Sequence, residues 1–107
     1  MFFIFIAKDR PGASALRAGT KARHKAYLDR GGDGVEVLLS GPTLSDDGRE
    51  TGSVIVVRAT GHPAAVAFFD GDPYHAADLF AERDLRPWDW RRGNRWIETA
   101  DAPSAPR

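Results

Sequence analysis

The N-terminal segment, residues 2–8, constrains the fold more than any other part of the sequence. It is rich in aromatic and β-branched residues, a composition that predicts a β-strand. Successive side chains of a strand point to opposite faces of its sheet. Both faces of this strand are therefore apolar, with Phe3 and Phe5 on one and Phe2, Ile4 and Ile6 on the other. Half-exposed antiparallel strands normally alternate apolar with polar residues, so we expect both faces of this strand to be covered.

The rest of the chain predicts helices and strands in a simple order. Residues 15–30 carry good helix formers behind Ser14, a candidate N-cap. A second helix opens at His62-Pro63 with its body at residues 64–69, and Asp72-Pro73 begins a further helical turn that is expected to run to Phe80. Three more strands are predicted at residues 35–40, 52–59 and 85–90, and the first two of these form a hairpin.

The order β-α-β-β-α-β is that of the ferredoxin-like fold of the α+β class. Its right-handed crossovers place both helices on one face of a four-stranded antiparallel sheet. The second apolar face is then left for something else to cover. We expect the sheet of another subunit there, in a homodimer or larger homo-oligomer; the alternative is that a few valines of strand 52–59 stay exposed.

Composition excludes several kinds of protein. The length of 107 residues suits one domain, predicted at residues 1–98, followed by a disordered tail at residues 99–107 that is rich in Ala and Pro. The absence of cysteine excludes disulfides, thiolate metal ligands and thiol nucleophiles. Basic and acidic residues balance at 15 each, which argues against nucleic acid as a partner. The apolar N-terminus is too short for a signal peptide or a membrane span, so we expect a soluble, cytoplasmic protein with no membrane partner.

His24 is the candidate for acid–base chemistry. It lies in the middle of the first helix, near Arg17 and Leu28 on the helical wheel, at the edge of the stripe that should face the sheet. Histidine is the side chain whose ordinary pKa permits proton transfer near neutral pH. The alternative is a partly buried histidine with a structural role alone.

The other candidates have ordinary structural interpretations as well. Asp72 precedes Pro73 at a helix start, where its carboxylate would cap backbone N–H groups. Ser40 ends a strand at a Gly-Pro turn. Tyr74 and Trp88 suit core or subunit packing, or a wall for a flat ring ligand. The histidines lack the spacing of a metal site, and the sequence has no GxGxxG, P-loop or GxSxG motif, so no metal and no cofactor are expected.

Several short motifs together resemble the YCII-related family over about residues 1–97. They follow the apolar N-terminal strand: Arg23-His24-Lys25-Ala26-Tyr27-Leu28, Ser40-Gly41-Pro42, Gly52-Ser53, Asp72-Pro73-Tyr74 and Arg86-Pro87-Trp88. The resemblance implies a dimeric α/β barrel, related in architecture to muconolactone isomerases and antibiotic-biosynthesis monooxygenases. One group of the family is similar to a dehydrochlorinase of chlorinated hydroxyquinols. The chain departs from the family pattern in the loop 31–34 and the extension 90–96.

The resemblance also implies a site. The family's proposed site is a His/Asp pair, which falls on His24 and Asp72. The resulting hypothesis is a lyase- or isomerase-type enzyme without cofactor, in which His24 transfers a proton, Asp72 orients it, and Ser40, Tyr74 and Trp88 contact the substrate. Elimination, dehydration or isomerisation of a small aromatic or enolisable molecule would suit these groups. The alternative is a non-catalytic dimeric protein that binds a small ligand or serves as an accessory; a histidine with no aspartate in reach would favour it.

Overall fold

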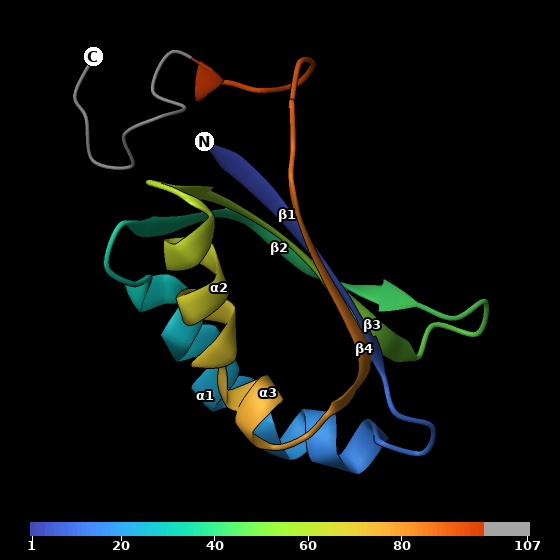
Figure 1. Cartoon of the computed structure of the whole chain (residues 1–107). Coiled ribbons are helices and arrows are strands. Elements are labelled where there is room, and N and C mark those ends of the chain that lie inside the picture. Colours follow the sequence, from blue (N-terminus) through green and yellow to red (C-terminus); the bar gives the residue numbers. More distant parts are fainter. Residues whose placement is uncertain (98–107) are drawn as a thin grey trace.

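The computed structural model describes residues 1–97, and its elements follow the predicted order (Figure 1). Both the last residue of the predicted domain and the predicted tail, residues 99–107, lie outside the described part. The elements are β1 (Phe2–Asp9), α1 (Ser14–Arg30), β2 (Val35–Leu44), β3 (Glu50–Ala59), α2 (His62–Asp70), α3 (Pro73–Ala76) and β4 (Phe80–Pro87). No helix within residues 1–97 has the length and apolar character that crossing a bilayer requires.

The sheet confirms the ferredoxin-like prediction. Within residues 1–97 its four strands are antiparallel in the order β2-β3-β1-β4, and the helices lie together on one face (Figure 1). The two strands that are apolar on both faces, β1 and β3, are the central ones, and Phe5 pairs with Ile55 across them. The edge strands β2 and β4 carry more polar residues, as edges that meet water should.

The core fills the space between the sheet and the helices. Phe3, Phe5 and Ile55 from the central strands are buried against Phe69 of α2, among others. The rings of Phe5 and Phe69 stack with their centroids 4.1 Å apart. Burial of each such side chain contributes about 1.5–3 kcal/mol, so this layer accounts for much of the stability of the domain.

Three local predictions were wrong. Ser14 does not cap α1; the N-cap is Ala13, and no side chain caps that end. The third helix stops at Ala76 instead of continuing to Phe80. The fourth strand begins at Phe80 and ends at Pro87, not at residues 85–90. Its segment Ala81-Glu82-Arg83-Asp84 is mostly polar and shows no strand alternation, and pairing with the backbone of β1 holds it in the sheet.

The chain itself covers part of the second face of the sheet. After β4 it turns back, and Trp90 is buried with Phe2 and Val56 in a small cluster on that side. The Trp90 and Phe2 rings meet edge to face with centroids 5.5 Å apart. The cover is incomplete, because Ile6 is 45% exposed and Leu39 47% exposed.

Candidate functional site

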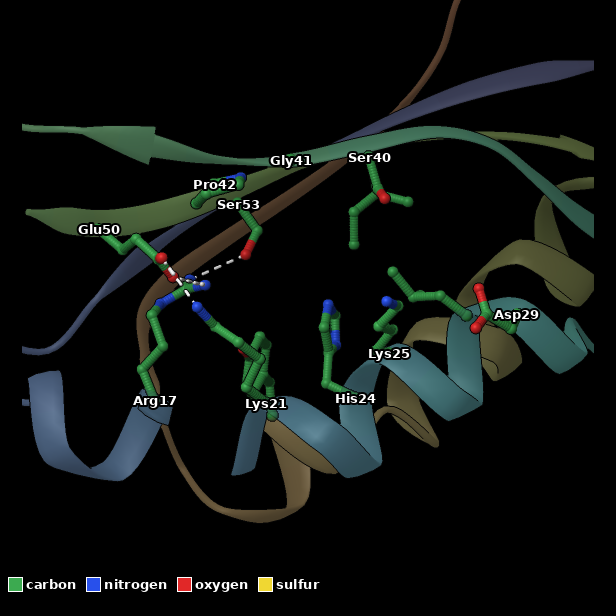
Figure 2. Close-up of a pocket in the computed structure, with 13 residues that line it drawn as sticks. Arg17, Lys21, His24, Lys25, Asp29, Ser40, Gly41, Pro42, Glu50 and Ser53 are labelled. Atoms are coloured by element: carbon green, nitrogen blue, oxygen red, sulfur yellow. Dashed lines mark hydrogen bonds and ion pairs between the residues drawn. The ribbon is translucent and has the colours of Figure 1, made fainter. Parts of the chain in front are cut away.

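A cavity of about 360 Å³ lies between α1 and the sheet. Figure 2 shows the side chains of α1 and those of β2 and β3 facing each other across it. Its volume falls within the range typical of small-molecule sites. The lining residues come from α1, β2, β3 and α3: Arg17, Lys21, His24, Lys25, Leu28, Asp29, Ser40, Gly41, Pro42, Glu50, Ser53, Ile55 and Tyr74.

His24 points from α1 into this cavity, toward the strand that carries Ser40 and Gly41 (Figure 2). The helical period places it on the same side of α1 as the buried residues Arg17, Thr20 and Leu28. The imidazole is mostly buried, and one edge of it reaches the cavity.

Asp72 holds His24 from the side away from the cavity. Its carboxylate oxygen Oδ1 lies 2.8 Å from Nδ1 of His24 and also accepts the backbone N–H of Tyr74 at 3.0 Å. The second contact makes Asp72 the N-cap of α3, as the Asp-Pro dipeptide predicts. A carboxylate can only accept, so in the neutral imidazole Nδ1 carries the proton and Nε2 keeps its lone pair.

Tyr74 forms one wall of the site. Its ring stacks on the imidazole of His24 with centroids 3.8 Å apart and an angle of 13° between the planes. The guanidinium of Arg17 lies over the same ring, with Cζ 4.8 Å from its centroid. Burial raises the pKa of the Tyr74 phenol above its ordinary value, so the wall stays neutral near neutral pH.

Tyr27 fixes the end of α2 against α1. Its hydroxyl donates to the carbonyl of Phe68 at 2.7 Å, and the two rings stack. The adjacent Gly71 leaves no room for a side chain, because an added Cβ would lie 2.5 Å from the Tyr27 hydroxyl. Since Gly71 directly precedes Asp72, this packing sets where the carboxylate stands relative to His24.

A β-bulge explains how Ser40 reaches the cavity. Val37 pairs with Val57, but the next paired residue on β2 is Leu39, opposite Val56. The extra residue re-aims the following side chains, and Ser40 then stands beside Ile55 on the face of the sheet that looks toward the helices.

Of the three predicted substrate-binding residues, the structure brings Ser40 and Tyr74 to this cavity but not Trp88. It lies beyond the end of β4, is 36% exposed and stacks on Trp90 with centroids 5.2 Å apart. It lines a separate hollow together with Phe2. The reason is that β4 ends at Pro87, where the chain turns toward the other face of the sheet.

Sequence reasoning missed the charged end of the cavity. Arg17, Lys21, Glu50 and Ser53 gather there from α1 and β3 (Figure 2). The sequence contained a partial indication for Arg17, because the helical wheel places it beside His24. It contained no indication that the strand residues Glu50 and Ser53 lie at the cavity. Among the described residues no three His, Cys, Asp or Glu side chains are grouped as a metal site requires.

The fold places the chain in the class of small α+β proteins with a ferredoxin-like sheet, and a paired histidine and carboxylate lie between its first helix and the sheet. The chain belongs to the YCII-related domain family, whose model matches residues 1–89. It is 27% identical over 94 residues to Protein YciI of Escherichia coli O6:H1, a match that covers 82% of this chain and 96% of that protein.

Two solved structures are also similar. The 5-chloro-2-hydroxyhydroquinone dehydrochlorinase TftG of Burkholderia phenoliruptrix AC1100, in complex with 2,5-dihydroxybenzoquinone, superposes with a TM-score of 0.73 at 31% identity, covering 88% of this chain and 99% of that one. The cofactor-independent oxygenase SnoaB of Streptomyces nogalater superposes with a TM-score of 0.55 at 20% identity, covering 87% and 96%. The second likeness is one of fold alone.

The contact with Asp72 predicts the tautomer of His24. We expect nitrogen-15 NMR of the neutral imidazole to show the proton on Nδ1, because Asp72 accepts from that atom. In the Asp72→Ala variant the proton should shift toward Nε2, the form that unconstrained histidines favour. The exposed His62 and His75 serve as internal references. A wild-type His24 with its proton on Nε2 would contradict the hydrogen bond.

Proposed function

We propose that this protein is a small acid–base enzyme that needs no cofactor, with His24 as the proton-transferring group and Asp72 as its orienting partner. One observation carries the proposal: Nδ1 of His24 lies 2.8 Å from a buried carboxylate while the ring borders a cavity. An imidazole held in one tautomer, with its second nitrogen toward a ligand space, has the geometry of a general base.

An elimination would proceed by a simple sequence. Nε2 of His24 takes a proton from a C–H or O–H of the substrate, and the released electron pair forms a new double bond. The leaving group departs with the electrons of its own bond to carbon. The Asp72 carboxylate stabilises the imidazolium, which then gives its proton to water or to the leaving group. Isomerisation differs only in that the proton returns to another atom of the substrate, and neither reaction needs an oxidant.

The cavity suits a molecule of about one ring. Tyr74 offers a flat face, Leu28 and Ile55 add apolar surface, and hydroxyls and charges surround them. The similarity to TftG, at 31% identity over nearly the whole of that protein, supports a hydroxylated ring compound as substrate and elimination as the reaction. We therefore place hydroxylated, halogen-bearing six-membered rings first among candidate substrates.

The catalytic proposal is tested with 5-chloro-2-hydroxyhydroquinone, kept free of oxygen, by following chloride release. We expect His24→Ala to lower kcat by about 10²–10⁴-fold, the usual contribution of a general acid or base. Asp72→Asn should lower kcat while the thermal midpoint changes little, because Asn also caps a helix.

Ser14→Ala is a matched control, since Ser14 caps nothing and lies outside the cavity. Turnover that is unchanged in His24→Ala would contradict the proposal. Tight binding of ring compounds with no turnover of any would instead assign the protein to the non-catalytic ligand-binding class.

We also propose that the chain assembles as a homodimer through the outer face of its sheet. On that face Ile6 pairs with Val54, and both Ile6 and Leu39 leave nearly half of their surface exposed. Two twisted sheets can pack face to face about 10 Å apart and cover such residues. The face that the Trp90 cluster leaves open would then be the subunit contact.

An aspartate placed on this face should disrupt the assembly. We expect wild type to sediment as a dimer at micromolar concentration and Ile6→Asp to sediment as a monomer or aggregate, because the charge would be buried at the contact. Leu16→Asp is the control, since Leu16 is similarly exposed, at 41%, but lies on α1. A wild type that is monomeric across the micromolar range would remove the basis for the dimer.

A further inference from the structure

Asp72 and His24 are 48 residues apart in the chain, so the packing of other residues must set the distance between them. The carboxylate directly follows Gly71, the C-cap of α2, so its place depends on where α2 ends. Tyr27 contacts that end of α2 from α1, three residues after His24 and so within one helical turn. A single helix therefore carries both the imidazole and a side chain that contacts the segment leading to its carboxylate partner.

The carbonyl of Phe68 joins Tyr27 to the end of α2. It accepts the Tyr27 hydroxyl at 2.7 Å and the backbone N–H of Gly71 at 3.2 Å. Burial, together with the negative charge of Asp72, raises the pKa of the Tyr27 phenol above its ordinary value, so the hydroxyl keeps its proton and remains a donor at neutral pH. The end of α2 is thus linked to α1 by a hydrogen bond that does not titrate near neutral pH.

Gly71 fits at this point only because it has no side chain. An added Cβ would lie 2.5 Å from the Tyr27 hydroxyl oxygen and 3.3 Å from Cζ of the same ring. The backbone at Gly71 has φ −89°, a value that any residue adopts, so the tyrosine and not the backbone requires glycine here. A side chain at this position must move either the tyrosine or the segment that leads to Asp72.

The loop 31–34 supports the same contact. Gly31, which follows α1, donates its N–H to the carbonyl of Tyr27 at 3.1 Å. The next residue, Gly32, packs on the ring of Phe68, where an added Cβ would lie 2.9 Å from Cδ1. The ring of Phe68 also stacks on that of Tyr27, with centroids 4.8 Å apart. This loop, one of the two departures from the family pattern, therefore has a structural role next to the site.

We propose that Tyr27 is a positioning residue for the His24–Asp72 pair. It acts through the Phe68 carbonyl and through its contact with Gly71, and none of these three residues lines the cavity. A general base must lie within hydrogen-bond reach of the proton that it removes, and misplacement by about 1 Å can cost about 10²-fold in rate. The effect on turnover rests on the proposed function, whereas the effect on the hydrogen bond of the pair does not.

The test is to introduce the side chain that Tyr27 excludes. Gly71→Ala should lower kcat for chloride release from 5-chloro-2-hydroxyhydroquinone, kept free of oxygen, by about 10–100-fold, because Asp72 is displaced from His24. KM should change little, since Gly71 lies outside the cavity. Nitrogen-15 NMR of the neutral His24 imidazole should show the proton moving from Nδ1 toward Nε2, because the acceptor at Nδ1 is displaced.

A second substitution tests whether the tyrosine oxygen is the cause. Tyr27→Phe removes that oxygen, and the atom of the ring nearest to a Cβ at residue 71 is then Cζ at 3.3 Å. The double variant Tyr27→Phe/Gly71→Ala should therefore turn over the substrate faster than Gly71→Ala alone and return the His24 proton toward Nδ1. Two substitutions that act independently would add their losses, so a recovery identifies a direct contact.

Gly19→Ala is the matched control. It makes the same change on α1 at a position where an added Cβ meets no atom within 4 Å, so it should alter neither kcat nor the tautomer of His24. Circular dichroism establishes that each variant is folded. The proposal is overturned if folded Gly71→Ala keeps the wild-type kcat and tautomer, or if the double variant is no faster than Gly71→Ala alone.

Gly32→Ala keeps the proposal testable if Gly71→Ala does not fold. Its Cβ would press on the Phe68 ring, which carries the carbonyl that Tyr27 contacts on its own backbone. The His24 proton should then move toward Nε2 as well, and an unchanged tautomer would overturn the proposal.

The tautomer of His24 also separates this inference from the catalytic proposal. A proton that moves toward Nε2 in Gly71→Ala, in a protein without turnover, would leave the positioning role standing and refute the enzyme. Turnover that needs His24 but is unchanged in Gly71→Ala would support the enzyme and refute the positioning role.

Discussion

The buried carboxylate of Asp72 is the constraint around which the site is arranged. With an exposed fraction of 1%, it must find hydrogen-bond donors within the protein. Its Oδ1 accepts from the N–H of Tyr74, which starts α3, and from Nδ1 of His24 on α1, while the buried Oδ2 has no hydrogen-bond partner among the described residues. Oδ1 of Asp72 thus links α1 and α3, which are distant in sequence. The preceding residue, Gly71, packs against the Tyr27 hydroxyl, and this contact fixes the position of Asp72. Loss of this carboxylate would affect both the helix start and the orientation of the imidazole.

Residues of α1 line both ends of the cavity because of the helical period. Arg17 and His24 are seven residues apart and so face the same side. One is paired to an acid on β1 and the other to an acid at α3, and Tyr74 lies against both. The cavity accordingly has His24 at one end and the cationic Arg17 at the other, along the ring of Tyr74.

Much of this arrangement could be predicted from the sequence, because its signals are local. The apolar residues on both faces of β1 indicated a strand that needs cover on both sides, and the Asp-Pro dipeptide indicated the cap at Asp72. The features that the sequence did not predict depend on pairing between segments that are distant along the chain. The polar start of β4 is a strand only because β1 lies beside it, Ser40 faces the cavity only because of a bulge against β3, and Ser53 meets Arg17 only through the register of the sheet. Trp88 lies away from the cavity because β4 ends at Pro87, before the residues 88–90 that the predicted strand included.

The central claim is that His24 exchanges a proton with a ring ligand bound in the cavity. It is tested most directly by incubating 1,2,4-trihydroxybenzene with the protein in oxygen-free heavy water and following loss of the ring-proton signals by NMR. The account predicts that wild type accelerates exchange of a ring C–H position with solvent and that His24→Ala returns the rate to that of the protein-free solution. Equal acceleration by wild type and His24→Ala, or no acceleration by wild type although the ligand is bound, would contradict it.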